Sequence, residues 1–296
     1  MKKIIFIVSV FLFLVIGVQN SMDDSRSELP KKPIGYKRVL AISPALEEIV
    51  LDLLEPESIV AISDASRKSS NEIVAKKANK IKNKVSERPS TEEIINLKPD
   101  VILIPVVFTR AQADTLRDCG FNVIPLEVPE GYEAIKKRIM YIAKNLGVEN
   151  KGKIVVKQMD SKMQSVRNRL KNIDGYKTVI GYSINGAFGR KNGSFDNICK
   201  EANAVNGAGL LNLQRGEHLS KEQIIKLDPD VIICSVSVRD SNMVEEILGD
   251  PAFTQIKAIQ NKNVVVTEDR YMSSSTQYFV DAVDHISKLV YPEHNT

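Results

Sequence analysis

This sequence of 296 residues has few of the side chains that metal sites and disulfide frameworks require. It contains no tryptophan, three histidines and three cysteines. Cys119, Cys199 and Cys234 are odd in number and widely spaced, so they predict no disulfide framework. The histidines show no spacing typical of a metal site. We therefore expect neither a directly bound metal ion nor a cofactor.

The sequence also has no large excess of charged residues of one sign. The 41 basic and 37 acidic residues leave a formal net charge of +4, without a long run of one sign. Because nucleic-acid binding depends on clustered basic residues, this composition gives it no support. A content of 43% hydrophobic and 26% charged residues is ordinary for a globular protein with a packed core.

Long hydrophobic runs are absent apart from one at the N-terminus. Lys2 and Lys3 precede the mostly apolar segment 4–18, and the polar stretch QNSMDDSRSE follows. This pattern is typical of a secretory signal peptide cleaved between Gly17 and Met22, since a membrane span needs about 20 apolar residues. An uncleaved anchor is the alternative. Because no cysteine stands directly after this segment, we expect a periplasmic protein without a lipid anchor.

One phrase of fourteen residues occurs twice in the chain. STEEIINLKPDVIL at 90–103 returns as SKEQIIKLDPDVII at 220–233, 130 positions later, with nine identical residues. Solenoid repeats have periods of only about 20–50 residues. The repeat therefore predicts two similar lobes.

Short apolar strands alternate with amphipathic helices on both sides of a continuous helical segment. This order predicts an α/β fold, with two Rossmann-like lobes whose parallel sheets are covered on both faces. The helical segment lacks proline and has apolar residues at helical spacing, which indicates a single long helix joining the lobes. The predicted parts are a signal peptide at 1–21, a polar leader at 22–36, an N-terminal lobe at 37–147, a connecting helix at 148–174 and a C-terminal lobe at 175–296.

Local helix and strand chemistry explains most of the repeated phrase. Ser90 and Ser220 are expected to be N-caps. Glu93 and Gln223, three residues later, are expected to complete a capping box in each copy. The isoleucines and leucine form a buried face, and a proline ends each helix.

Glu92 and Glu222 occupy equivalent positions in the two copies but are not the capping-box residues. Each lies in the first helical turn and is expected to point outward. One interpretation is a carboxylate that favours the helix dipole, worth about 0.3–1 kcal/mol. The other is a pair of docking carboxylates, one on each lobe, on the same face of the molecule.

The strand ends of two facing parallel sheets predict a ligand cleft between the lobes. Arginines beside aromatic residues in these loops suit a large planar or aromatic ligand with carboxylates or catecholates, although any single arginine could simply be solvated. The candidate ligand-binding residues are Ser43, Asp64, Arg67, Phe108, Arg110, Tyr182, Asn185, Phe188, Arg190, Arg239 and Tyr271.

No segment predicts catalysis. GAGLLN at 207–212 is close to a dinucleotide-binding fingerprint, but it follows a helix and lacks the last glycine. GRKNGS at 189–194 lacks the spacing of a phosphate-binding loop. No histidine is placed at a strand end where it could serve as a base. We therefore expect a protein that is not an enzyme.

Segments spanning nearly the whole chain, in order, resemble the class III periplasmic substrate-binding proteins of ABC importers, which carry ferric siderophores, haem and cobalamin. Besides the repeated phrase, the resemblance rests on SPALEEIVLDL at 43–53, NGSFDNICKEANAVNGAG at 192–209, IKAIQNKNVVVTED at 256–269 and YFVDAVDHISKLVYPE at 278–293. In that family a glutamate on each lobe, at the positions of Glu92 and Glu222, pairs with arginines of the membrane permease.

The resemblance implies a monomeric carrier that delivers a small-molecule metal complex to a permease dimer in the inner membrane, which works with a cytoplasmic ATPase. Tyr182 or Tyr271 could supply a phenolate to haem iron, or be a stacking or core residue. Two alternatives stay open: an exported sensor or interaction protein of the same fold, and a binding protein for a free divalent metal ion. The connecting helix is expected to keep closure of the lobes small.

Overall fold

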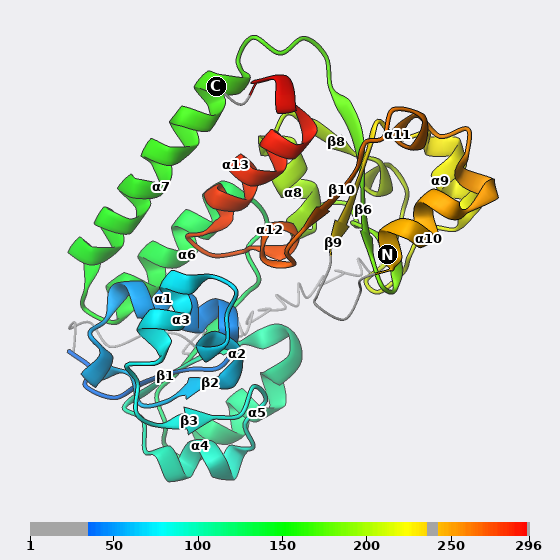
Figure 1. Ribbon diagram of the computed structural model, residues 1–296. Coiled ribbons are helices and arrows are strands. Elements are labelled where there is room, and N and C mark those ends of the chain that lie inside the picture. Colours follow the sequence, from blue (N-terminus) through cyan, green and yellow to red (C-terminus); the bar gives the residue numbers. More distant parts are fainter. Residues whose placement is uncertain (1–34, 236–241, 295–296) are drawn as a thin grey trace, which may run out of the picture. The chain divides into compact units, whose positions relative to one another are not determined.

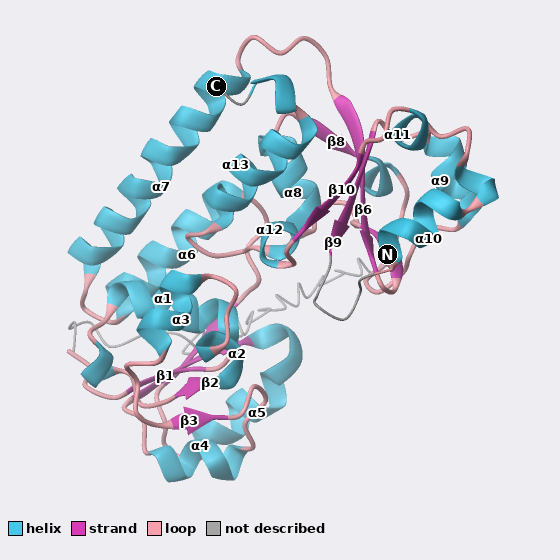
Figure 2. Cartoon of the chain, viewed as in Figure 1, coloured by secondary structure: helices cyan, strands magenta, loops and turns pink. Residues whose placement is uncertain are grey.

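The computed structural model describes residues 35–235 and 242–294, in which strands and helices alternate (Figures 1 and 2). The predicted signal peptide lies outside the described residues. Residues from Pro33 onward belong to one compact unit. In the described part of the chain, no helix is both long enough and apolar enough to cross a membrane.

The first lobe has a three-stranded parallel sheet of order β1–β4–β5 and a parallel pair, β2–β3. Its elements are β1 (Val39–Ala41), α1 (Pro44–Leu53), η1 (Pro56–Ser58), β2 (Ile62–Ser63), α2 (Asp64–Arg67), α3 (Glu72–Ala78), β3 (Lys84–Val85), α4 (Thr91–Leu97), β4 (Val101–Pro105), α5 (Val106–Asp118) and β5 (Val123–Leu126). The apolar run of β4 is buried except at its last residue, as expected for a central parallel strand.

The second lobe has a sheet of order β10–β9–β6–β7, with β8 also paired to β6. Its elements are β6 (Lys177–Ser183), β7 (Gly186–Phe188), α8 (Ser194–Glu201), β8 (Ala204–Asn206), η2 (Gly207–Leu210), α9 (Lys221–Leu227), β9 (Val231–Ser235), α10 (Met243–Gly249), η3 (Pro251–Phe253), α11 (Lys257–Gln260), β10 (Val264–Thr267), α12 (Arg270–Ser273), α13 (Phe279–Val290) and η4 (Pro292–His294). All pairings are parallel except the β6–β7 hairpin. The glycine-rich stretch 186–194 thus begins with a short antiparallel strand, because Gly186 adopts φ 109° at the turn.

The lobes are joined by α7 (Glu149–Leu170), and α6 (Tyr132–Asn145) packs against it. Gly147, with φ 73°, breaks the helical run at the position that the sequence predicts. α7 is a continuous helix of 22 residues, the long green helix of Figure 1. Its buried residues recur at helical spacing, so one side of the helix faces the protein interior.

One hydrophobic core cluster runs through both lobes and the helices between them. It includes Leu46 of α1, Ile139 of α6 and Met159 of α7. It continues into the second lobe with Ile198 of α8 and Ile286 of α13. α6 and α7 are therefore part of the core that the lobes share.

The repeated phrase begins its helix in the same way in both lobes, but only one copy has the predicted capping box. Ser90 Oγ accepts a hydrogen bond from Glu93 N at 3.1 Å, which confirms the first N-cap. Ser220 and Gln223 form the complete box in α9. The box predicted for α4 is wrong: the Glu93 carboxylate instead accepts hydrogen bonds from the backbone N–H and hydroxyl of Ser86. In the second copy the position equivalent to Ser86 is Gly216, which has no hydroxyl to offer.

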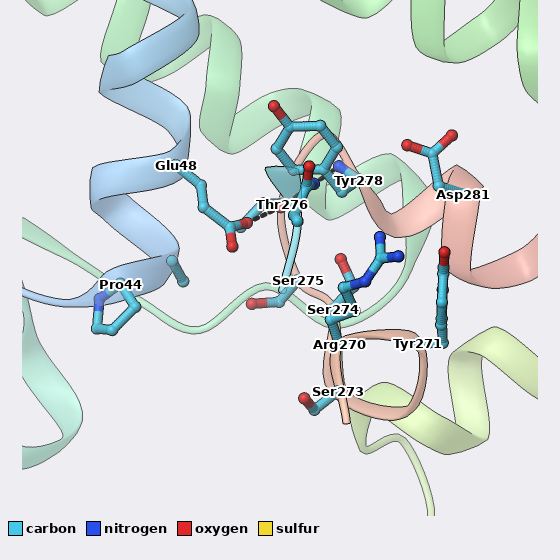
Figure 3. A pocket seen from close by; sticks show the side chains of 12 residues that line it. Pro44, Glu48, Arg270, Tyr271, Ser273, Ser274, Ser275, Thr276, Tyr278 and Asp281 are labelled. Atoms are coloured by element: carbon cyan, nitrogen blue, oxygen red, sulfur yellow. Dashed lines mark hydrogen bonds between the residues drawn. The ribbon is translucent and has the colours of Figure 1, made fainter. Parts of the chain in front are cut away.

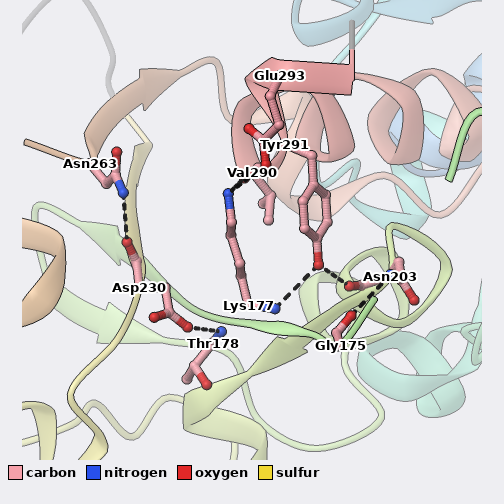
Figure 4. Close-up of polar contacts among 9 residues, drawn as sticks. All are labelled: Gly175, Lys177, Thr178, Asn203, Asp230, Asn263, Val290, Tyr291 and Glu293. Carbon is pink, nitrogen blue, oxygen red and sulfur yellow. Dashed lines mark hydrogen bonds and ion pairs between the residues drawn. The ribbon is translucent and has the colours of Figure 1, made fainter. Parts of the chain in front are cut away.

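In each phrase an aspartate stands between the helix and the strand. It forms hydrogen bonds with backbone at or just before the start of the first strand of its lobe. Asp100 Oδ2 accepts from Lys37 N at 3.1 Å, and Asp100 N donates to Arg38 O at 2.8 Å. Asp230 Oδ2 accepts from Thr178 N at 2.7 Å (Figure 4). Asp230 N donates to Thr178 O at 2.8 Å. The duplicated phrase thus builds a similar clamp twice, which binds two residues just before β1 in the first lobe and Thr178 alone in the second, a role that the sequence did not predict.

Gly152 of α7 lies close against α6. A Cβ at this position would lie 2.5 Å from Ala143 Cβ and 3.2 Å from Met140 Sδ, both on α6. Despite the higher helix propensity of alanine, we expect Gly152→Ala to lower the free energy of unfolding by about 1–3 kcal/mol, because the helices must separate. Urea denaturation would measure this loss.

The matched control is Lys157→Ala, an exposed position on the same helix, which should change the free energy of unfolding by less than about 0.5 kcal/mol. A Gly152→Ala variant as stable as the parent would contradict the close packing of α6 on α7.

Candidate functional site

A pocket of about 190 Å³ lies where β1 and β10 end (Figure 3). One side comes from the start of α1 and a loop residue before α3. The other comes from the segment 270–281. The lining residues are Pro44, Ala45, Glu48, Asn71, Arg270, Tyr271, Ser273, Ser274, Ser275, Thr276, Tyr278 and Asp281. Both lobes therefore contribute to it, at the edge of the sheets where open α/β folds bind their ligands.

Side-chain hydrogen bonds join the two sides of this pocket. Thr276 Oγ1 donates to Glu48 Oε2 at 2.6 Å. Gln277 Nε2 donates to the backbone oxygen of Glu48 at 2.8 Å and to Asp52 Oδ2 at 2.9 Å. Lys77 also pairs with Asp52. Segment 276–277 is thereby fixed to α1, and Figure 3 shows the Glu48 carboxyl group between Pro44 and this segment.

Two adjacent carboxyl groups in the first turns of α1 have perturbed acidity. Burial raises the pKa of Glu47, whose oxygens accept from Ser63 N at 2.9 Å, Ser63 Oγ at 2.6 Å and Ser66 Oγ. Burial also raises the pKa of Glu48, and the nearby Asp52 carboxylate adds to the shift. Glu47 bonds within its own lobe and Glu48 bonds to the other lobe.

Tyr271 forms one wall of the pocket and is covered on both ring faces. The Arg270 guanidinium lies 4.0 Å from its ring centroid. The His285 ring stacks against it at 3.9 Å with an interplanar angle of 14°. Burial lowers the pKa of His285, which favours the neutral imidazole, and Arg270 is held by two contacts to Glu268, at 3.0 and 3.3 Å. The Tyr271 ring is therefore held between Arg270 and His285.

Of the predicted ligand-binding residues, Tyr271 lines this pocket, and three from the first lobe have other partners. Ser43 Oγ accepts from a backbone N–H in the first turn of α1. Arg67 donates to backbone carbonyls of the loop 81–83. Asp64 forms an ion pair with Lys84 at 2.9 Å. These side chains position helices and loops of the first lobe.

The predicted residues of the second lobe lie around the β6–β7 hairpin. Tyr182 is half-buried against the core of the lobe, and burial raises its pKa, which favours the phenol over the phenolate. Phe188 packs on Phe195 with ring centroids 5.7 Å apart. Asn185 is exposed in the turn, and Arg190 donates to the backbone carbonyl of the next residue at 3.2 Å.

The other predicted residues are spread over the described surface or lie beyond it. Arg110 is exposed on α5. The side chain of Phe108 and the whole of Arg239 lie outside the described part of the structure. Glu92 and Glu222 are exposed in the first turns of α4 and α9. Hydrogen bonds from its own backbone N–H and the Ser220 hydroxyl lower the pKa of Glu222, so this carboxylate is ionised.

Sequence reasoning missed Glu48, Asn71 and the run Ser273–Thr276. The signal that could have found Glu48 is an acidic pair in the otherwise apolar helix SPALEEIVLDL. The helical period places Glu47 and Glu48 next to buried leucine and isoleucine positions. A carboxyl group beside such positions requires hydrogen-bonding partners from other elements.

Two α/β lobes with parallel strands, joined by α7 and sharing a pocket at their strand ends, define the class III periplasmic binding protein fold. The chain belongs to the periplasmic binding protein family, whose model matches residues 39–271.

Similar proteins are known from several organisms. An uncharacterized ABC transporter substrate-binding lipoprotein of Bacillus subtilis is 23% identical over 282 residues, covering 92% of this chain and 86% of its own. A possible iron-binding (periplasmic solute-binding) protein of Staphylococcus epidermidis has a TM-score of 0.74 at 20% identity, covering 87% of this chain and 100% of its own. A periplasmic haem-binding protein of Roseiflexus has a TM-score of 0.74 at 19% identity, covering 88% and 100%. At such identities the likeness to the solved structures shows the fold.

The raised pKa of Glu48 makes stability depend on pH in a defined direction. The folded chain holds the Glu48 proton more tightly than the unfolded chain does. Its contribution is therefore complete below the ordinary pKa of 4.5 and is lost as the pH rises through the raised value. We expect Glu48→Gln, which stays uncharged, to be more stable than the parent near neutral pH by on the order of 1 kcal/mol. This difference should disappear in acid.

Melting temperatures of both proteins across a pH series would measure this difference. Glu57→Gln, an exposed glutamate on η1, is the control and should show no such trend. A difference between Glu48→Gln and the parent that is the same at every pH would contradict the role of burial.

Proposed function

We propose that the protein is the extracytoplasmic substrate-binding component of an ABC importer, which captures a small-molecule metal complex between its lobes and delivers it to a permease dimer. The observation that carries this proposal is a pocket built by both lobes at their strand ends, in a chain of the periplasmic binding protein family. The N-terminal segment, with the pattern of a secretory signal, supports export to the periplasm.

The cargo class is proposed as a ferric siderophore, haem or cobalamin. A cobalamin-binding protein of Halobacterium salinarum is 18% identical over 264 residues, covering 88% of this chain and 70% of its own. The haem-binding protein of Roseiflexus has the same fold. A free divalent ion is a weaker candidate, because among the described residues no group of three or more His, Cys, Asp or Glu side chains could hold a metal ion.

A thermal-shift panel of haem, ferric siderophores, cobalamin and free metal ions would test the cargo class. We expect one of the metal complexes to raise the melting temperature, because a ligand that binds only the folded chain stabilises it. Absorbance spectra would then identify the complex and confirm its return unchanged. A shift with Mn²⁺ or Zn²⁺ alone would overturn the proposal of a metal complex.

Glu92 and Glu222 are proposed as the permease-docking residues. Both are exposed, and they occupy equivalent positions on α4 and α9, the helices of the duplicated phrase. Exposed ion pairs contribute only about 0–1 kcal/mol each. Two such contacts can orient the carrier on its permease without holding it there, and they act mainly on encounter rate and register.

Reversing both charges, Glu92→Lys with Glu222→Lys, should abolish uptake by cells and leave cargo affinity unchanged, because neither side chain lines the pocket between the lobes. Transport assays and binding titrations with the purified protein would measure the two effects. The matched control is Glu57→Lys with Glu149→Lys, two other exposed glutamates, which adds the same charge elsewhere and should preserve uptake. Loss of cargo binding in the Glu92/Glu222 variant would refute the docking role.

The shared core predicts that cargo binding closes the lobes only slightly. α7 packs against α1 of the first lobe and α13 of the second, so a wide hinge motion would have to expose core residues. Small-angle X-ray scattering with and without the cargo found in the panel would measure the radius of gyration. A decrease of several ångströms on binding would contradict a stiff connection.

A further inference from the structure

The charged groups on the lining of the pocket are already compensated within the protein. Arg270 is held by Glu268 through two contacts, at 3.0 and 3.3 Å. Asp281 pairs with Lys162 at 2.8 Å. Burial beside other carboxylates raises the pKa of Glu48, which favours its uncharged form. The lining thus offers no uncompensated positive charge to a ligand.

The hydrogen-bonding groups of the lining are less fully engaged. Among the described residues, the buried Oγ of Ser274 has no hydrogen-bond partner. Asn71 Oδ1 accepts from the N–H of Ile73 at 3.1 Å and caps α3, which leaves the amide Nδ2 of this lining residue as a donor. Thr276 occupies one oxygen of the Glu48 carboxyl group, which leaves the other oxygen for a ligand. Neutral donors and acceptors therefore surround the same space.

The size of the pocket indicates that it holds part of a ligand. Its volume of about 190 Å³ is smaller than the roughly 300–1,000 Å³ of a complete small-molecule pocket. Pro44, Ala45 and Tyr271 give it apolar walls. A short polar arm with an apolar stem fits such a space, whereas a whole macrocycle does not.

We propose that this pocket is a recognition subsite for an uncharged arm of the cargo that both donates and accepts hydrogen bonds, typically a primary amide, and that it rejects a carboxylate. The inference rests on the proposed function, because it presumes that a cargo binds between the lobes.

The chemistry of the lining explains both halves of this preference. An amide N–H can bond to the second Glu48 oxygen, while the amide carbonyl accepts from Ser274 Oγ or Asn71 Nδ2. A carboxylate would instead place negative charge near Asp52 and Asp281. Since Arg270 is already bound to Glu268, that charge would meet no free cation among the described residues that line the pocket, and a desolvated charge without a partner is strongly disfavoured.

A panel of four probes in two matched pairs tests the preference. Cyanocobalamin, with peripheral amides, is compared with haemin, which carries two carboxylates; ferrichrome, an uncharged hydroxamate complex, is compared with ferric enterobactin, an anionic catecholate complex. Dissociation constants come from titration of the full chain. We expect the tightest binder to be an uncharged probe, tighter than its charged counterpart by about tenfold or more, which corresponds to one unpaired polar contact.

The outcomes of the panel distinguish failure of the proposed preference for an uncharged arm from failure of the proposed cargo class. If haemin or ferric enterobactin binds most tightly, the inference is overturned while the proposed function stands. If none of the four probes binds, both the inference and the proposed cargo class fail.

Variants of the pocket provide a second test with the tightest uncharged probe. Ser274→Ala should weaken binding by about five- to tenfold without lowering the melting temperature, since this hydroxyl supports no other group. Glu48→Ala should also weaken binding, and Glu48→Gln should recover most of the loss because its carboxamide is neutral and hydrogen-bonding. Ser165→Ala, an exposed serine on α7, is the control and should bind like the parent. Unchanged affinity in Ser274→Ala would overturn the assignment of the subsite.

Discussion

The shared hydrophobic core is the constraint on which the rest of the structure depends. α6, α7 and α13 place side chains into the same buried cluster as α1 and β4 of the first lobe, so the lobes are not independent bodies. Moving one lobe away from the other would expose apolar surface at a cost of about 25 cal/mol per Å². The distance between α1 and segment 276–277 is therefore held by packing, and the pocket between them exists before any ligand arrives.

The polar contacts at the start of α1 depend on that packing. Glu47 and Glu48 are adjacent in sequence, yet one is bonded to Ser63 and Ser66 of its own lobe and the other to Thr276 of the opposite lobe. Consecutive residues of a helix point about 100° apart, which lets one helical turn serve two neighbours. The helix thereby connects local structure in the first lobe to the shared site.

The sequence predicted most of the fold because its signals are local or repeated. The duplicated phrase indicates two lobes, and its caps at Ser90 and Ser220 follow from residue chemistry within four positions. The capping box of α4 could not be predicted in this way. Its outcome depends on Ser86, which precedes the helix and offers two donors to Glu93.

The candidate site was less predictable because its polar groups are assembled from distant parts of the chain. The arginines that suggested an anionic ligand have local alternatives that composition does not reveal: Arg67 donates to backbone carbonyls and Arg190 to the carbonyl beside it. The pocket instead uses serines and an asparagine, which are common in loops and give no distinctive pattern. The fold brings Ser273–Thr276 to the side of the pocket opposite Glu48, and Asn71 to the same side as Glu48.

The clamps formed by Asp100 and Asp230 help to explain why the repeated phrase can be recognised in the sequence although the residues that it binds differ. Each aspartate binds backbone at or just before the start of the first strand in its lobe. It uses an N–H and a carbonyl, which every residue except proline provides. The side chains at the bound positions can therefore differ, as those of Lys37 and Thr178 do, without breaking the clamp. The aspartate, which uses its side chain, is the same residue in both copies. The residues that it binds use only their backbone, and they differ between the copies.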